Sequence, residues 1–540
     1  MAGIAQNSAG MALGTVLSRV TGVLRDIMMT AALGFFIVSD AYSLGNTLPN
    51  IIYILVAGGA LNAVFIPQLV RHMKSDDDGG KAFADRLLSA VGVLLLLLSV
   101  ASVALAPYIV DIYTTSDVSQ NEYDLAVAFA RLCLPQIFFY GAYTMLQQVL
   151  NARGKFAAAM FAPIANNIVA IAVFGGFIAV VRPTADSLAT LSSGQVWWLG
   201  LGTTFGVALQ AAVLLPPLIK SGYKYGFRSD FRGGGLGHAG GLALWTVGLV
   251  IANQIGYAVI TRLATSANIL AEQVGASAAG LTTYQKAHLI FVLPHSVITV
   301  SLVTALLPKL SELAHQRDFT ELGRQVRQSA RVVLALLMPV AALMAVTAPD
   351  LTALLFGYGA AGTEAARTTG QVVSVFALGL PAYSLVYVLY RAWYSLEDTK
   401  TPFWIALLIN VLNLGFALWW FGSVDRTEQI PSLAWAYTLA YSVASLVAFG
   451  WLNRRLPGLQ PVATAGLALR LLVASAVAAA AAHLLPALGT SMAAMTATLA
   501  LQWLLGLAVF VALSALLRIT EVRKGLGLAI SRVRPRRTAA

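Results

Sequence analysis

Charged side chains stand inside an otherwise apolar segment near the N-terminus. The stretch "SRVTGVLRD" (residues 18–26) contains Arg19, Arg25 and Asp26, and Asp40 opens the next apolar segment. An arginine at the centre of a membrane helix costs about 2.5–3.5 kcal/mol on insertion scales. A guanidinium donates two parallel hydrogen bonds, which suits a phosphate group. The sequence therefore predicts a wet, cationic cavity that binds an anion. The alternative for Arg25 and Asp26 is a purely structural ion pair.

Further polar groups occur in later apolar segments. Asn50 follows a proline in the segment 41–70, whose prolines and glycines predict a bent helix beside a cavity. Lys286 and His288 lie in "TYQKAHLIFVLPHSV" (residues 283–297), and Arg262 ends the segment 239–262. We interpret these residues as candidate cavity groups. The alternatives are a hydrogen-bonded structural histidine and, for Arg262, an anchor at the membrane boundary.

No residue pattern indicates catalysis. The chain lacks the glycine-rich Gly-x-x-x-x-Gly-Lys-Ser/Thr loop of ATP-hydrolysing proteins and shows no catalytic serine or cysteine arrangement. The histidines have too few neighbouring ligands for a zinc site. We therefore expect a protein that is not an enzyme and requires no cofactor, and whose energy comes from a coupling ion, the membrane potential or the substrate's own concentration difference.

The composition indicates an all-α polytopic membrane protein. Of 540 residues, 58% are hydrophobic and 11% are charged, about half the charged fraction of a soluble chain. The apolar runs do not alternate as β-barrel strands do. The single cysteine, Cys133, excludes an intrachain disulfide. The net charge of +12 is explained by cytoplasmic loops, so no nucleic-acid partner is expected.

Charge in the loops predicts the topology. The loops after even-numbered spans, together with the C-terminal tail, hold 26 of the 35 basic residues. This bias places those loops and both termini in the cytoplasm. Fourteen transmembrane helices are predicted, at residues 8–34, 41–70, 87–112, 125–150, 156–181, 195–219, 239–262, 277–308, 329–356, 368–394, 402–422, 431–452, 463–486 and 491–517.

An internal repeat predicts the domain organisation. "FIPQLVRHM" (65–73) resembles "LLPKLSELA" (306–314), and two further landmarks recur at offsets between 241 and 246 residues. Two six-helix bundles at 1–225 and 235–455 then enter the membrane in the same orientation, as a parallel repeat. A C-terminal helix pair (460–517) and a basic cytoplasmic tail (518–540) follow. Duplicated bundles of this kind suit a transporter that opens to each side in turn.

Three sequence motifs resemble those of a known protein family. "GTVLSRVTGVLRDIMMTAALG" (14–34), "GGALNAVFIPQLV" (58–70) and "SLEDTKTP" (395–402) resemble the MurJ (MviN) family of lipid II flippases, within a superfamily of multidrug and polysaccharide exporters. The resemblance implies transport of lipid II, the undecaprenyl-diphosphate-linked peptidoglycan precursor, to the outer leaflet by alternating access. It implies that Arg19, Arg25 and Asp40 belong to the substrate site, and it makes the bilayer and cell-wall synthesis proteins candidate partners.

Some positions depart from the family pattern. Tyr53, Ile54 and Gly58 stand where well-known members have charged residues, and Leu289 replaces an arginine. We therefore hypothesise that Lys286, His288 or Arg262 rebuilds part of the anion site. Two alternative functions stay open. A gradient-driven multidrug exporter of the same fold should present carboxylates to a cationic drug, and a membrane scaffold for cell-wall enzymes would transport nothing.

Overall fold

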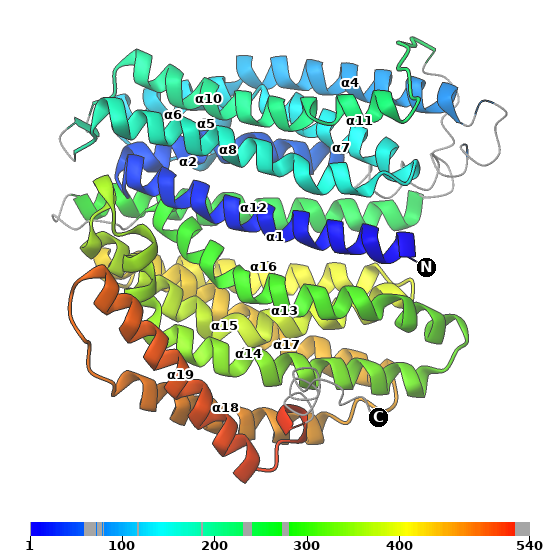
Figure 1. Ribbon diagram of the computed structural model, residues 1–540, viewed down its shortest axis with the longest axis vertical. Helices are drawn as coiled ribbons and strands as arrows, with labels where there is room; N and C mark the ends of the chain where they lie inside the picture. The colour runs from blue at the N-terminus through cyan, green and yellow to red at the C-terminus, as the bar shows by residue number, and fades with distance from the viewer. Residues whose placement is uncertain are drawn as a thin grey trace, which may run out of the picture. The chain divides into compact units, whose positions relative to one another are not determined.

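The computed structural model describes residues 2–58, 72, 78, 80–115, 118–184, 187–188, 190–230, 240–272 and 280–523. These residues form helices, turns and loops, and no strand occurs among them. The chain divides into two compact units (Figure 1). Unit 1 comprises residues 1–282 and 358–362, and unit 2 comprises residues 283–357 and 363–540.

Unit 1 is built mainly from the first eleven labelled helices of the described chain and from the later helix η3. They are α1 (Ala2–Leu33), α2 (Ile37–Tyr53), the π-helix η1 (Ile54–Gly58), α4 (Lys81–Ala104), α5 (Ala106–Tyr113), α6 (Gln120–Cys133), α7 (Gln136–Ala152), α8 (Phe156–Val181), α10 (Ser193–Ala212), α11 (Leu215–Lys220), α12 (Gly240–Glu272) and the short η3 (Gly359–Ala361).

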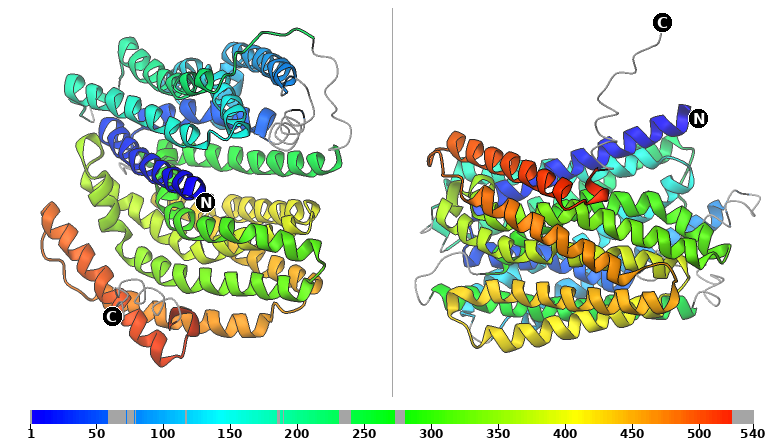
Figure 2. Two further views of the ribbon diagram at one scale, coloured as in Figure 1. Left: turned by 45° about the vertical axis from the view of Figure 1, so that its right-hand side comes forward. Right: turned by 90° about the horizontal axis from the view of Figure 1, so that it is seen from below.

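Unit 2 begins within a long helix. This helix, α13 (Leu281–His315), starts in unit 1 and continues into unit 2. The remaining helices are α14 (Phe319–Phe356), α15 (Thr363–Ser395), α16 (Lys400–Phe421), η4 (Arg426–Glu428), α17 (Gln429–Arg455), α18 (Pro461–His483) and α19 (Met492–Leu516). The last two lie side by side and form the C-terminal pair (Figures 1 and 2).

Every predicted transmembrane span overlaps a helix, so the all-α membrane fold is confirmed. Twelve of the helical stretches among the described residues are long and apolar enough to cross a membrane. The first two predicted spans are not among the twelve: the described part of α1 carries Arg19, Arg25 and Asp26, and α2 has 17 residues. The total of fourteen therefore stays a prediction.

Three predicted spans are each divided into two helices. The breaks precede or contain a proline, between α4 and α5, between α6 and α7, and between α10 and α11. Proline lacks a backbone N–H and cannot donate the next helical hydrogen bond, so a new helix begins at each of these positions. Apolar length alone predicts the span and does not show the break.

The predicted domain boundaries stay predictions. The compact units separate at residue 282, whereas the repeat predicts a boundary at 225–235; α12 contacts α2, α5 and η1 and so belongs to unit 1. Except for residue 72, the repeat landmark at 65–73 lies outside the described residues, as do residues 59–70 of the span 41–70, which is predicted to bend, and the tail from residue 524. The predicted bundle of residues 1–225 and unit 1 nevertheless share the ten described helices from α1 to α11.

Helix α1 is held in unit 1 by two surfaces. It packs along α8, where Gly14 lies against Met160 and Phe161. At its other end it meets η3, where Gly359 adopts a positive φ of 59°. A Cβ at Gly359 would lie 2.4 Å from a backbone oxygen of Ala31, so only glycine allows this approach. These contacts fix the helix that carries the first candidate site residues.

Candidate functional site

Arg25 and Asp26 form a polar cluster with Asn167 on α8. Arg25 Nη2 donates to Asp26 Oδ2 at 3.0 Å, and Arg25 Nη1 donates to Asn167 Oδ1 at 3.3 Å. The amide of Asn167 in turn donates to the backbone oxygen of Ser18 and to Thr21 Oγ1, both at 3.0 Å. The carbonyl oxygen of Asn167 is thereby turned towards the guanidinium. The amide orients Arg25 without adding charge.

The guanidinium of Arg25 keeps donors for a ligand. Its side chain is 37% exposed, whereas that of Asp26 is 12% exposed. An arginine has five N–H donors, and the two contacts above use only part of this set. The remaining donors can meet an anion directly. The predicted structural ion pair therefore exists, and the geometry also leaves the arginine accessible.

Arg19 lies on the side of α1 that Asp26 occupies, two turns towards the N-terminus. Residues seven apart share a helix face. Arg19 is exposed and forms no ion pair within the described part of the chain. Its neighbours Val16 and Val20 are 58% and 60% exposed. Arg19 is thus a charged group on an apolar, exposed stretch of α1, and its predicted place beside an anion-binding cavity stays a prediction.

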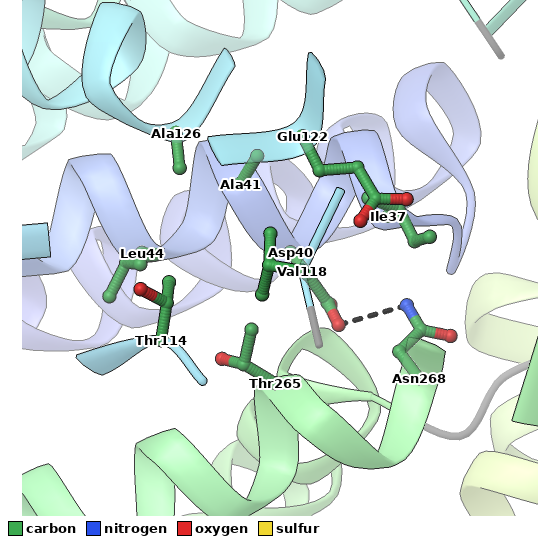
Figure 3. Close-up of a pocket in the computed structure, with 10 residues that line it drawn as sticks. All are labelled: Ile37, Asp40, Ala41, Leu44, Thr114, Val118, Glu122, Ala126, Thr265 and Asn268. Carbon is green, nitrogen blue, oxygen red and sulfur yellow. Dashed lines mark hydrogen bonds between the residues drawn. The ribbon is translucent and has the colours of Figure 1, made fainter. Parts of the chain in front are cut away.

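Asp40 has a different environment (Figure 3). Its carboxylate is 3% exposed and accepts three hydrogen bonds, from Asn268 Nδ2 at 2.9 Å, from the backbone N–H of Leu281 at 2.9 Å and from that of Thr282 at 2.7 Å. The two backbone donors belong to the first turn of α13, whose N–H groups have no partner within the helix. Asp40 of α2 therefore caps α13 and ties it to the end of α12.

The space beside Asp40 is small. A pocket between α2 and the neighbouring segments has a volume of about 20 Å³. This volume holds about one water molecule. Figure 3 shows the Asp40 carboxylate pointing to Asn268 rather than into this space. A diphosphate does not fit there, and a carboxylate repels it. The contacts of Asp40 are structural, and its predicted place in a substrate site stays a prediction without support from this geometry. The pocket is lined by Ile37, Asp40, Ala41, Leu44, Thr114, Val118, Glu122, Ala126, Thr265 and Asn268.

Arg262 lines a second cavity of unit 1. It is exposed on α12 and borders a polar space of about 380 Å³. The opposite lining comes from the ends of α5 and α6 and includes Asp111, Gln120 and Tyr123. A carboxylate in the same lining offsets the attraction of Arg262 for an anion. This cavity is lined by none of the other predicted site residues.

Lys286 and His288 both lie in unit 2, two residues apart on α13. Lys286 is 4% exposed. His288 lies 3.5 Å from the hydroxyl of Tyr437 and packs against the rings of Phe291 and Phe376. A histidine enclosed by aromatic rings with one hydroxyl partner fits the alternative of a structural histidine. Nearby, Nδ1 of His295 lies 2.9 Å from Ser384 Oγ and continues this aromatic cluster.

The last two positions lie along α2. Asn50 is exposed, in the turn after Pro49. Tyr53, at one of the positions that depart from the family pattern, donates a hydrogen bond to Thr144 Oγ1 at 2.8 Å. Asn50 is accessible to a ligand, whereas Tyr53 is engaged with α7.

Two residues that position the site were absent from the prediction. Asn167 orients Arg25, and Asn268 helps to hold Asp40. A signal for the first was present: Asn166 and Asn167 interrupt α8, whose other residues are almost all apolar. An amide in such a helix needs a partner, and a charged residue on a neighbouring helix is the natural one. For Asn268 the sequence shows no comparable contrast.

The chain was compared with known protein families. A family model described as lipid II flippase MurJ matches residues 29–507. The chain belongs to this family. The match starts beyond Arg25, so membership rests on the rest of the chain and does not test the two arginines of α1.

Relatives of the family agree with the assignment. The chain is 28% identical over 449 residues to a protein of Rhizobium meliloti (strain 1021) named probable lipid II flippase MurJ, covering 81% of this chain and 77% of the relative. It is 28% identical over 405 residues to the lipid II flippase MurJ of Burkholderia cenocepacia, covering 74% and 75%.

Solved structures show the same fold. A lipid II flippase MurJ in an inward closed conformation aligns with a TM-score of 0.73 and 17% identity, over 94% of this chain and 98% of that one. An inward-facing multidrug transporter of the MATE family aligns with a TM-score of 0.62 and 16% identity, over 83% and 95%. At these identities the likeness concerns the fold, which flippases and multidrug transporters share.

Proposed function

We propose that this protein moves lipid II from the inner to the outer leaflet of the bacterial plasma membrane by alternating access, with both termini in the cytoplasm. Membership in the flippase family carries the proposal. The site geometry supports it, since Arg25 presents a partly exposed guanidinium that an amide holds in place. A diphosphate can accept the donors that Asp26 and Asn167 leave free.

The two arginines of α1 have separate roles in this proposal. Arg19, exposed and without an ion pair among the described residues, attracts the diphosphate and forms the first contact. Arg25, fixed by Asn167, provides the oriented hydrogen bonds. Asp26 keeps the cluster close to neutral when no substrate is bound, which lowers the cost of the buried charge.

The membrane potential is our proposed energy source, and no cofactor is required. An anionic head that leaves a negative interior gains about 2.3 kcal/mol per elementary charge at 100 mV. Transport that carries negative charge outward therefore runs downhill electrically. A coupling ion is the alternative; dissipating the potential while ion gradients are held constant separates the two.

The proposal that Lys286, His288 or Arg262 replaces missing family arginines has weaker support. His288 is engaged by aromatic rings and Tyr437, and Arg262 shares its cavity with Asp111. Neutralising Lys286 and Arg262 together tests the idea. Full growth complementation by the double variant K286Q/R262Q would rule out a replacement by these two residues.

The central experiment measures transport directly. The purified protein is placed in liposomes that contain fluorescent lipid II, and the fraction reached by an external, membrane-impermeant quencher is followed over time. We expect R19Q and R25Q to slow the exchange, with R470Q, an exposed arginine of α18, as the matched control. Wild-type liposomes that exchange lipid II no faster than empty ones would contradict the proposal.

The multidrug-exporter alternative finds no support in the carboxylates. A cationic drug needs an accessible carboxylate, but Asp26 is paired with Arg25 and Asp40 is enclosed by three donors. The likeness to multidrug transporters concerns the fold alone. The anion-transport function is therefore the better reading of the site.

A further inference from the structure

A large cavity lies within unit 2, away from the residues discussed so far. It has a volume of about 900 Å³, at the upper end of the range for ligand sites. Helices α13, α14 and α19 form its walls, together with the residues that follow α19. The lining comprises Ile298, Arg324, Arg327, Gln328, Arg331, Val332, Ala335, Leu336, Pro339, Val340, Leu507, Phe510, Val511, Thr520, Glu521 and Val522.

Three arginines stand at one end of this cavity, and two of them are already paired. Arg324 donates to Glu321 through Nε at 2.6 Å and Nη2 at 2.7 Å. Arg331 pairs with Glu521 at 2.7 Å. Among the described residues Arg327 has no such carboxylate partner, and its Nη1 is shielded from solvent without a hydrogen bond to any of them. A buried, unsatisfied guanidinium N–H is costly, which indicates that a ligand normally completes it.

The other end of the cavity is apolar. Leu336, Pro339, Leu507 and Phe510 line it, and its floor is the hydrophobic core between α14, α18 and α19. Leu336 and Leu507 remain 48% and 39% exposed. The cavity therefore has a cationic end and an apolar wall, and both are formed by the same helices.

The position along α14 fits the membrane interface. Residues 332–349 contain no charged side chain and are long enough to fill the hydrocarbon core. The three arginines precede this stretch, so they stand at headgroup depth while Leu336 and Pro339 lie deeper. A molecule that satisfies both ends has a charged head at the interface and a hydrocarbon chain below it.

We propose that this cavity binds an anionic phospholipid carrying one phosphodiester, with phosphatidylglycerol as the simplest example. Its phosphate accepts from Arg327, and an acyl chain lies along the apolar wall. Basic pockets between membrane helices are known to hold anionic headgroups. Because two of the three arginines are neutralised by glutamates, a single negative charge balances the site.

Charge argues against the chain's own tail as the occupant. The residues after α19 add Arg523, Lys524, Arg532, Arg534, Arg536 and Arg537. A cationic segment gains nothing from the unpaired guanidinium of Arg327. The bound lipid would instead join α14 to α19 and stabilise the C-terminal helix pair.

The test is lipid retention by the full-length protein in mixed micelles of phosphatidylglycerol and phosphatidylcholine, counted by native mass spectrometry. We expect the wild type to retain phosphatidylglycerol preferentially. R327Q should lower its apparent affinity about tenfold, the loss of one charge-assisted hydrogen bond. R327K keeps the charge, should retain part of the binding and guards against a folding defect. R454Q, an exposed arginine at the end of α17, is the matched control.

Three outcomes would overturn the proposal: equal retention of both lipids by the wild type, unchanged retention by R327Q, or an equal loss in R454Q. A fourth is displacement of phosphatidylglycerol by undecaprenyl phosphate at lower concentration, which would assign the cavity to a polyprenyl chain. The measurement uses no transport, so its result is independent of the proposed flippase function.

Discussion

Arg25 and Asp40 show two ways in which this protein accommodates charge in its first two apolar segments. Arg25 has a carboxylate and an amide beside it, yet its side chain is 37% exposed. Asp40 is 3% exposed and its carboxylate accepts three hydrogen bonds from α12 and α13. Arg25 therefore keeps hydrogen-bond donors without a partner and is accessible, whereas the hydrogen-bond acceptors of Asp40 are occupied and its side chain is buried.

A charged residue in an apolar helix is therefore not by itself evidence of a ligand site. An enclosed carboxylate that accepts backbone N–H groups acts as a helix cap, and its removal damages the fold. An accessible guanidinium with donors left over can exchange partners during function. Asp40 should therefore control stability, and Arg25 should control transport.

The largest effect is expected from removing the enclosed carboxylate. D40A leaves the N–H groups of Leu281 and Thr282 and the amide of Asn268 without their acceptor. Unsatisfied buried donors cost about 1–3 kcal/mol each, so for three donors we expect at least about 3 kcal/mol of destabilisation. Thermal unfolding in detergent measures the shift, and D124A, an exposed aspartate of α6, should change little. A normal melting temperature for D40A would remove the distinction between the two sites.

Neutralising the open arginine should affect transport instead. R25Q keeps a polar side chain but loses the charged donors, worth about 1.5–3 kcal/mol for a bond to an anion. Lipid II exchange in liposomes should slow roughly 10- to 150-fold, with the melting temperature close to that of wild type. R25K should recover part of the rate, because an ammonium keeps the charge and lacks the fork. A variant that melts early without losing rate would make Arg25 structural.

A smaller effect is expected from the amide that orients Arg25. N167A removes the 3.3 Å contact to Arg25 Nη1 and leaves the charge in place. A neutral hydrogen bond contributes about 0.5–1.5 kcal/mol, so exchange should fall roughly 2- to 10-fold. N413A, which replaces a buried asparagine of α16, is the control. Combined with R25Q, the second substitution should add little, since both act on one contact.

An exposed ion pair between α4 and the loop after α11 serves as a reference and should give the smallest effect. Arg86 Nη2 donates to Asp230 at 2.6 Å and holds the pKa of that carboxyl below its ordinary value. Such a pair stabilises the fold above the ordinary aspartate pKa of about 4 and loses its contribution as the pH falls through the lowered value. D230N should leave the melting temperature at pH 7 unchanged, because exposed pairs contribute little. A clear loss at pH 7 would show that exposure is a poor guide to the role of a charge.

Part of the site was predictable because its signals are local. Arg19, Arg25 and Asp26 contrast with apolar neighbours, and the cost of charge in a membrane marks them without any tertiary information. Asn166 and Asn167 in α8 contrast with their apolar neighbours in the same way. The pairing of Arg25 with Asn167 spans 142 residues, and nothing in the intervening sequence specifies it.

Asp40 shows where the sequence is insufficient. The resemblance placed it with the arginines, whereas its partners lie more than 220 residues away, on α12 and α13. Arg327 shows the same limit. Its charge contributed to the predicted topology, but only the structure shows that its Nη1 lies in a cavity beside α19 without a hydrogen bond to any described residue.

The amino-acid order by itself determined the membrane class, the helical segments and the charged first helix, because hydropathy and charge act on each segment separately. The tertiary structure decided which charges are enclosed and which are open. Burial and hydrogen-bond partners depend on helices that are distant in the chain, so no single segment contains that information.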